Sequence, residues 1–169
     1  MQPELIHASE RFACGIGVRN SNAAESTPQT SEVFPLWRRF FNEKRGENIG
    51  ARQSPNLLFG IYSNYESDHD GAYDLHVAGK VNSHTQDFQE FDILRIPAGR
   101  YLVFRNRGTM PQAVLQTWDH IQRFFESNAD NQRAFTTDFE VYDLRDDGGV
   151  EIHIAICDPD ELMPNYPPR

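Results

Sequence analysis

Two segments of the sequence place an acidic side chain and a histidine on one face of a strand. The segment 150–156 reads VEIHIAI, and its strict alternation of β-branched residues predicts a strand with Glu151 and His153 on the same face. The segment 73–78, YDLHVA, repeats this order of acid and histidine. A carboxylate on such a strand can attract a cation, or it can activate a water molecule together with a neighbouring hydroxyl.

Metal and phosphate chemistry are not predicted from the remaining motifs. His76 and His153 each stand alone on their strands, so a hydrogen-bonded or exposed histidine is expected rather than a metal ligand. The acidic segment 68–70, DHD, is expected to be a solvated turn. Gly15 and Gly17 are followed by neither the third glycine nor the Gly-Lys-Ser of a phosphate loop. We therefore predict no metal and no cofactor.

The chain reads as two copies of one unit. Arg19 corresponds to Arg105 with an offset of 86 (105 − 19), and Asp74 corresponds to Glu151 with an offset of 77 (151 − 74). Each copy has the order strand, helix, strand, strand, so we predict an α+β fold with an antiparallel sheet and two helices flanking a ligand cleft. The predicted parts are a lead-in, two repeats that form one domain, and a proline-rich tail: residues 1–10, 11–79 and 91–157 within 11–157, and 158–169.

Each copy contains one amphipathic helix. Apolar residues recur at helical spacing in both copies, which predicts one apolar stripe on each helix. Thr30 or Ser31 is the expected N-cap of the first helix. The first stripe contains Val33, Phe34, Trp37, Phe40 and Phe41, and the second contains Val114, Leu115, Trp118, Ile121, Phe124 and Phe125.

Composition limits the class of protein. The 169 residues suit one domain with a real core, and the formal net charge of −9 argues against direct nucleic-acid binding because an acidic surface repels phosphates. No apolar run is long enough for a membrane span, and the N-terminus lacks the order of a signal peptide, so a cytoplasmic protein is expected. The two cysteines, Cys14 and Cys157, form no zinc or thioredoxin motif.

Four motifs, in this order along the chain, resemble the GyrI-like effector-binding domain, which also forms the ligand-sensing part of some AraC-type and MerR-type regulators. They are the turn 97–101 (PAGRY), the helix around Trp118, the strand 139–143 (FEVYD) and the strand 150–156. The resemblance covers about residues 10 to 157. Ala155 departs from the family, which often has proline at this position.

The resemblance implies a standalone effector-binding module of the mobile integron-cassette kind, which binds lipophilic cationic drugs in an aromatic cleft with a buried acid. The sequence offers no basic recognition helix of the kind that the related regulators use to bind DNA. Glu151 matches the family's acid in the last strand and is the preferred cleft acid, Glu140 on the neighbouring strand is second, and His153 shares the predicted face of Glu151. The expected cleft walls are Trp37, Tyr101, Phe104, Trp118 and Tyr142.

Several alternatives stay open at this point. Alternation alone would turn Glu151 toward water, and Trp37 and Trp118 are equally compatible with a buried core. Glu151 with Tyr142 suits a hydrolase of small reactive compounds, as in some relatives. An acidic surface also suits an inhibitor that docks on a basic protein partner, and a homodimer is compatible with the sequence.

Overall fold

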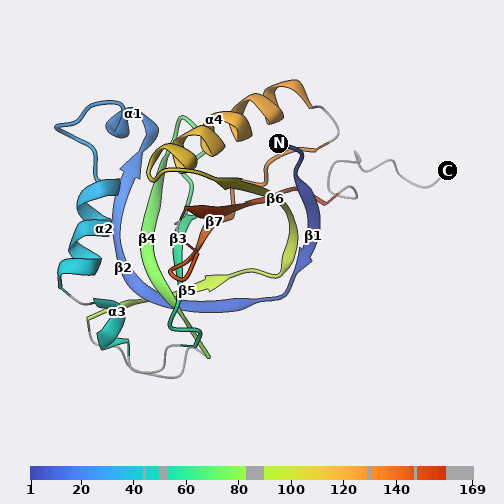
Figure 1. Ribbon diagram of the computed structural model, residues 1–169. Helices are drawn as coiled ribbons and strands as arrows, with labels where there is room; N and C mark the ends of the chain where they lie inside the picture. The colour runs from blue at the N-terminus through green and yellow to red at the C-terminus, as the bar shows by residue number, and fades with distance from the viewer. Residues whose placement is uncertain (44, 50–52, 83–89, 129–130, 147, 159–169) are drawn as a thin grey trace.

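The computed structural model describes residues 1–43, 45–49, 53–82, 90–128, 131–146 and 148–158, and in this part of the chain it has one eight-stranded antiparallel sheet with helices on its outer side (Figure 1). The strands lie in the order β1-β6-β8-β7-β3-β4-β2-β5. They are β1 (Glu4–Ala8), β2 (Arg11–Ser21), β3 (Leu57–Ser63), β4 (Ala72–Val81), β5 (Asp92–Ile96), β6 (Gly99–Arg107), β7 (Thr137–Asp143) and β8 (Gly149–Ala155). The helices are α1 (Asn22–Glu25), α2 (Val33–Asn42), α3 (Arg45–Asn48) and α4 (Gln112–Ser127).

The sheet has the symmetry of a duplicated unit, and the predicted α+β fold is confirmed. From one edge to the middle of the sheet the order is β1, β6, β8, β7, and from the other edge it is β5, β2, β4, β3. The strands at the same position in these two series correspond to each other. One strand was missed. Residues 4–8, predicted to be part of a lead-in, form β1 and pair with β6. In the other half of the sheet, β5 pairs with β2 in the equivalent position. The predicted tail lies outside the described residues from 159 onward.

Strand register supports the alignment of the two copies. Arg19 lies opposite Asp74 between β2 and β4, and Arg105 lies opposite Glu151 between β6 and β8. Both acids form ion pairs with the arginine opposite, at 3.1 Å in the first copy and 2.8 Å in the second. The acid that the sequence analysis singled out therefore has the same cross-strand partner in each half of the molecule.

Both faces of the sheet are packed, but in different ways. On the outer face, Phe40 of α2 and Ile121 of α4 are buried against β-strand side chains. Figure 1 shows α2 beside β2 and β4, and α4 across β6. On the inner face, Phe59, Tyr101 and Phe139 form a separate cluster. No helix in the described residues is long and apolar enough to cross a membrane. The space between α2 and α4 on the outer face of the sheet contains the candidate site.

Candidate ligand-binding site

A cavity of about 1180 Å³ opens between α2 and α4, above β3 and β7. Both helices contribute to it, as the predicted fold requires. Trp37 of α2 contacts Tyr142 of β7 edge to face, with ring centroids 5.1 Å apart, and Trp118 of α4 contacts Tyr62 of β3 in the same way at 5.0 Å. These four rings surround one carboxylate, that of Glu140.

Glu140 is the acid at the centre of the cavity. It is 1% exposed, and its carboxylate accepts three hydrogen bonds. Tyr62 Oη and Trp118 Nε1 donate to Oε1 at 2.9 and 2.6 Å, and Tyr142 Oη donates to Oε2 at 2.8 Å. All three donors come from side chains that are themselves held by ring contacts, so the carboxylate has one fixed position.

A glycine on the neighbouring strand makes room for this carboxylate. Gly60 of β3 lies directly opposite Glu140 of β7. A Cβ atom at residue 60 would meet Oε2 of Glu140 at 2.5 Å, which is too close for any side chain. The glycine lets the acid lie flat against β3 instead of pointing away from the sheet.

Glu140 has no cationic partner among the residues that the structure describes. Burial raises the pKa of its carboxyl group, and the hydrogen bonds from Trp118, Tyr142 and Tyr62 offset only part of this rise. Burial also raises the pKa values of the Tyr62 and Tyr142 hydroxyls well above 10, so both remain proton donors at neutral pH. The site is a buried carboxylate with neutral hydrogen-bond donors and no built-in countercharge.

The neighbouring acid on the same face of β7 is neutralised within the protein. Asp138 is 0% exposed, and its Oδ2 accepts hydrogen bonds from Arg133 at 2.6 Å and from Tyr65 at 2.8 Å. The Phe135 ring lies 4.4 Å from the Arg133 guanidinium and holds it in place. Phe135 itself has a φ of 48°, a left-handed conformation that is rare for a bulky residue. The backbone at this end of the cavity is therefore strained at Phe135, beside the ion pair.

Glu25 is a second acid in the cavity wall, and the sequence analysis missed it. Its Oε1 accepts the backbone N–H groups of Glu32 and Val33, at 2.7 and 3.2 Å, and thereby caps α2. Thr30 or Ser31 was expected to be the N-cap of this helix, but the N-cap residue is Glu32. The Ser31 hydroxyl instead donates to Oε2 of Glu25 at 2.7 Å. Burial alone would raise the pKa of Glu25, but these hydrogen bonds and one from Asn20 lower it overall.

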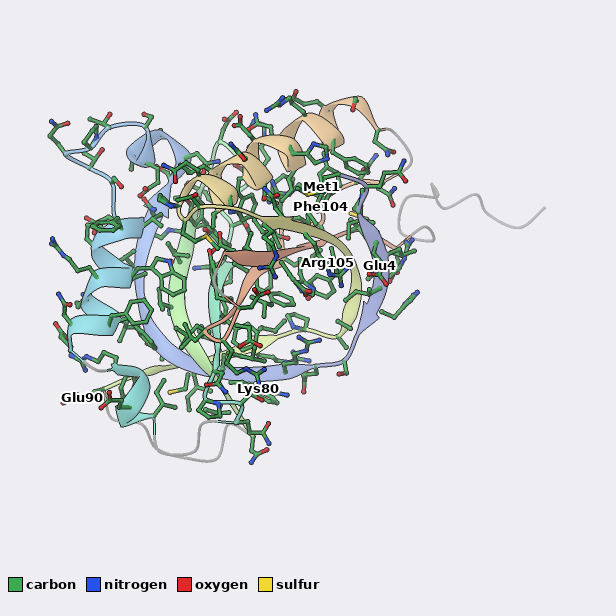
Figure 2. All side chains as sticks on the ribbon, in the orientation of Figure 1. Met1, Glu4, Lys80, Glu90, Phe104 and Arg105 are labelled. Atoms are coloured by element: carbon green, nitrogen blue, oxygen red, sulfur yellow. The ribbon has the colours of Figure 1, made fainter. Side chains whose placement is uncertain are left out.

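Glu151, which the sequence analysis preferred as the cleft acid, lies outside the cavity. Glu151 lies opposite Val141, on the face of the sheet away from Glu140 and Tyr142. Its side chain is 41% exposed, does not line the cavity, and pairs with Arg105 at 2.8 Å. Arg105 also pairs with Glu4 of β1, and Figure 2 shows these two residues next to each other. Glu151 and Tyr142, the pair considered for the alternative of a hydrolase, lie on opposite faces of the sheet.

The other predicted site residues divide in the same way. Trp37, Trp118 and Tyr142 line the cavity as predicted walls, and Tyr101 and Phe104 do not. Tyr101 is in the cluster of the inner face, where its hydroxyl donates to the carbonyl of Pro97, and Phe104 is fully buried beneath α4. In Figure 2, Phe104 lies on the side of β6 nearest α4.

His153 also lies on the inner face. Its ring is 4% exposed and stacks on Phe139 at 4.3 Å. Burial lowers the pKa of the imidazole to about 4, although the nearby charge of Glu151 acts in the opposite direction. A neutral, buried imidazole stacked on a ring is a core side chain, and His153 therefore contributes nothing to the cavity.

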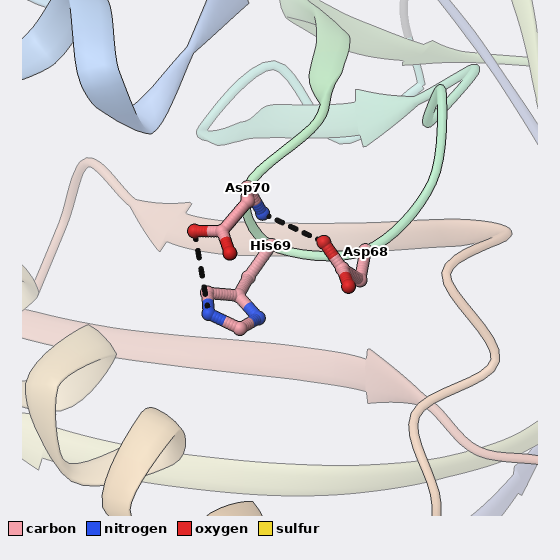
Figure 3. A group of neighbouring side chains, drawn as sticks. All are labelled: Asp68, His69 and Asp70. Atoms are coloured by element: carbon pink, nitrogen blue, oxygen red, sulfur yellow. Dashed lines mark hydrogen bonds and ion pairs between the residues drawn. The ribbon is translucent and has the colours of Figure 1, made fainter.

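The acidic turn predicted at residues 68–70 is an exposed group (Figure 3). Among the described residues, Asp68, His69 and Asp70 are the group whose possible metal-ligand atoms lie closest, within 4.8 Å of one another. Within the turn, the Asp70 N–H donates to Asp68 at 2.9 Å and His69 lies 3.5 Å from Asp70. The His69 carbonyl also accepts from Asn22 Nδ2 at 2.8 Å. Such contacts are those of an ordinary polar turn.

The fold and the cavity define a small-molecule binding module of the effector-binding class. The chain belongs to the Cass2 family, described as integron-associated effector binding protein, whose model matches residues 5–156. No curated protein matches the sequence.

Three solved structures show the same fold. An integron cassette protein from the mobile metagenome of Vibrio cholerae is 30% identical, with a TM-score of 0.76 over 92% of this chain and 96% of that one. SAV2435, solved bound to tetraphenylphosphonium, is 17% identical, with a TM-score of 0.77 over 96% and 98% of the two chains. The C-terminal domain of EcmrR is 17% identical, with a TM-score of 0.60 over 92% and 97%.

Proposed function

We propose that this protein binds lipophilic organic cations in the cavity between α2 and α4, with Glu140 as the countercharge. One observation carries the proposal: the Glu140 carboxylate is buried among three neutral donors and has no cationic partner in the described residues. Taking a carboxylate out of water costs several kcal/mol, and each hydrogen bond to it returns about 1.5–3 kcal/mol. A cation that enters the cavity supplies the missing electrostatic stabilisation.

The walls of the cavity suit a cation with a large apolar surface. Aromatic faces attract quaternary or delocalised cations by about 0.5–2 kcal/mol each. Phe34, Phe41, Leu115 and Leu144 also line the cavity and are 51–69% exposed, so its mouth is apolar as well. Contacts of this kind depend on area more than on direction, which favours a range of ligands over a single one.

The comparison with SAV2435 supports the same proposal. Tetraphenylphosphonium, to which that protein is bound in its structure, is a lipophilic cation that cannot donate a hydrogen bond. A ligand of this type can interact with Glu140 through charge and with the aromatic walls through contact area. It is therefore a suitable probe for the cavity of this protein.

The test is a titration with tetraphenylphosphonium followed by tryptophan fluorescence. Both tryptophans of the chain, Trp37 and Trp118, line the cavity, so the signal arises at the site itself. Wild type is compared with Glu140→Gln, whose amide oxygen can still accept from Tyr62 and Trp118 while its NH₂ group donates to Tyr142 Oη.

Glu151→Gln is the matched control, since it removes the same charge from the opposite face of the sheet. We expect Glu140→Gln to weaken binding at least tenfold, which corresponds to about 1.4 kcal/mol, and Glu151→Gln to change it less than twofold. Equal binding by wild type and Glu140→Gln would contradict the proposed role of Glu140. No binding by wild type would contradict the proposed function.

A further inference from the structure

The cavity is larger than one compact cation needs. Its volume of about 1180 Å³ exceeds the roughly 300–1,000 Å³ typical of small-molecule sites. It also contains a second carboxylate that is partly buried, that of Glu25 at the N-terminus of α2. These two features together indicate a ligand with more than one recognition point.

Glu25 resembles Glu140 in what surrounds it. Its carboxylate accepts hydrogen bonds from the Asn20 side chain, the Ser31 hydroxyl and two backbone N–H groups, all of them neutral donors. In the described part of the chain it forms no ion pair. Because its pKa is lowered, it carries a full negative charge at neutral pH. It is therefore a fixed, ionised group on the cavity wall.

Two tyrosine rings connect the two acids. Tyr62 donates to Glu140, and its ring lies 5.4 Å from that of Tyr73, centroid to centroid. Burial raises the pKa of Tyr73 to about 12, and the charges of Glu25 and then Glu140 contribute to the rise. Tyr73 thus lies within the field of both carboxylates, and aromatic surface occupies the space between them.

The other charged groups in the cavity wall differ from these two. Arg133 is paired with Asp138 at 2.6 Å, and Asp119 is exposed and paired with Arg123 at 3.0 Å. Glu126 is exposed and accepts from Gln122 at 3.3 Å. Within the residues described, Glu140 is a buried cavity carboxylate without a cation, and Glu25 is a partly buried one without a cation.

We propose that the preferred ligands are dications, in which two cationic centres are joined by an apolar spacer, with one centre at Glu140 and the other at Glu25. The spacer lies along Tyr62 and Tyr73. This inference rests on the proposed function, since it assigns a second charge-binding point to the same cavity. It adds a chemical preference that binding at Glu140 alone would not produce.

The test compares decyltrimethylammonium with decamethonium, which has the same alkyl chain and a trimethylammonium group at each end. For a cavity with one acid, the second trimethylammonium group, which replaces a hydrogen of the terminal methyl group, weakens binding because its charge must be desolvated. For a cavity with two acids, the second charge strengthens binding, because it interacts with the second carboxylate. Affinities are measured by tryptophan fluorescence for wild type, Glu25→Gln and Glu140→Gln.

The glutamine variant at residue 25 removes the charge and keeps the hydrogen bonds. Its amide oxygen can take the place of Oε1, which accepts from Asn20, Glu32 and Val33, and its NH₂ group can donate to the Ser31 hydroxyl. The cap of α2 is thereby preserved, and a thermal unfolding curve checks this directly.

We expect wild type to bind decamethonium at least tenfold more tightly than decyltrimethylammonium. Glu25→Gln should abolish this advantage, because it weakens the binding of decamethonium much more than that of decyltrimethylammonium. Glu140→Gln should weaken both ligands. The inference is overturned if decamethonium has no advantage, or if Glu25→Gln weakens both ligands equally, which is the result expected of a purely structural cap.

A second measurement needs only the wild-type protein. Shorter and longer bis-trimethylammonium alkanes should show maximal affinity at one chain length, since the separation of the two carboxylates is fixed. A steady rise of affinity with chain length would contradict the inference. Failure of the proposed function is distinct, because decyltrimethylammonium would then fail to bind or would bind Glu140→Gln as tightly as wild type.

Discussion

Asp138 and Glu140 lie on the same face of β7, two residues apart, and both are almost completely buried. Asp138 pairs with Arg133 and also accepts the backbone N–H of Ala155 at 2.8 Å, so its charge belongs to the fold. Glu140 has neutral partners alone among the described residues, so its charge is available to a ligand. Burial does not distinguish a structural carboxylate from a ligand-binding one. The presence or absence of a built-in cation does.

The largest expected effect is a loss of stability when Asp138, the structural carboxylate, is changed. Asp138→Asn leaves the Arg133 guanidinium buried without a counterion and sets an amide NH₂ against donor groups. Breaking a buried pair in this way costs about 3–5 kcal/mol. Chemical denaturation should show this loss, whereas Asp146→Asn, at the exposed pair with Arg107, should cost less than about 1 kcal/mol. Similar losses for both variants would remove the distinction between buried and exposed pairs.

Glu140→Gln is expected to have the opposite effect on stability. The pKa of Glu140 is raised above its ordinary value of 4.5, so the ionised group destabilises the folded state at neutral pH. The variant should therefore be more stable than wild type by about 1–3 kcal/mol at neutral pH. The difference should shrink as the pH falls through the raised pKa and vanish below about 4.5, where Glu140 is protonated in both the folded and unfolded states. If the variant were less stable than wild type at neutral pH, the ionised Glu140 would not be destabilising the folded state.

Cation affinity should decrease as the pH is lowered, and the decrease should begin above pH 4.5. Protonation of Glu140 removes the countercharge. Because one proton is involved, the affinity for the cation can fall by at most about tenfold per pH unit. Glu25 has a lowered pKa and does not titrate in this range. Tyr142→Phe removes a hydrogen bond that lowers the pKa of Glu140, so it should shift the midpoint to higher pH. Fluorescence titrations at several pH values test this, and a profile that Glu140→Gln leaves unchanged would assign the pH dependence to another group.

The smallest effect is expected at the acid that the sequence singled out. Glu151→Gln removes one partner of a half-exposed pair with Arg105, which should cost less than about 1 kcal/mol of stability. The expected change in cation affinity is less than twofold. Asp74→Asn, at the equivalent pair with Arg19, is the matched control and should behave in the same way. A larger loss of cation binding for Glu151→Gln alone would return that acid to the site.

The repeat predicted most of the fold. The offsets of 86 and 77 residues found in the sequence reappear in the strand register. Gly17 lies opposite His76 in the first copy, and Val103 lies opposite His153 in the second. The offset is 86 for the first residue of each pair (103 − 17) and 77 for the second (153 − 76). Trp37 and Trp118 were identified from helical spacing and lie where the two helices face each other. Periodicity and self-similarity are local signals, and they were sufficient for these elements.

The choice of acid depended on which face of each strand the helices cover, which alternation does not reveal. In β8 the apolar residues Ile152 and Ile154 lie beneath α4, so Glu151 points to the other face. In β7 the polar residues Asp138 and Glu140 are the ones on the helix side. The spacing of Glu140 and Tyr142, two residues apart, placed them on one face and was a usable signal. The pairing with Gly60 is a long-range contact that no local pattern shows. The capping role of Glu25 spans seven and eight residues across a loop and follows no helical or strand period.

The most direct test of Glu140 as an uncompensated charge uses two ligands that differ in one atom. Both have the same aromatic body and a short ethylene glycol tail for solubility, and their head groups are trimethylammonium and tert-butyl. Wild type should prefer the ammonium ligand at least tenfold, or by about 1.4 kcal/mol, and Glu140→Gln should lose this preference. An equal preference in both proteins would show that the cavity recognises cations without the charge of Glu140, and would contradict its assignment as the countercharge.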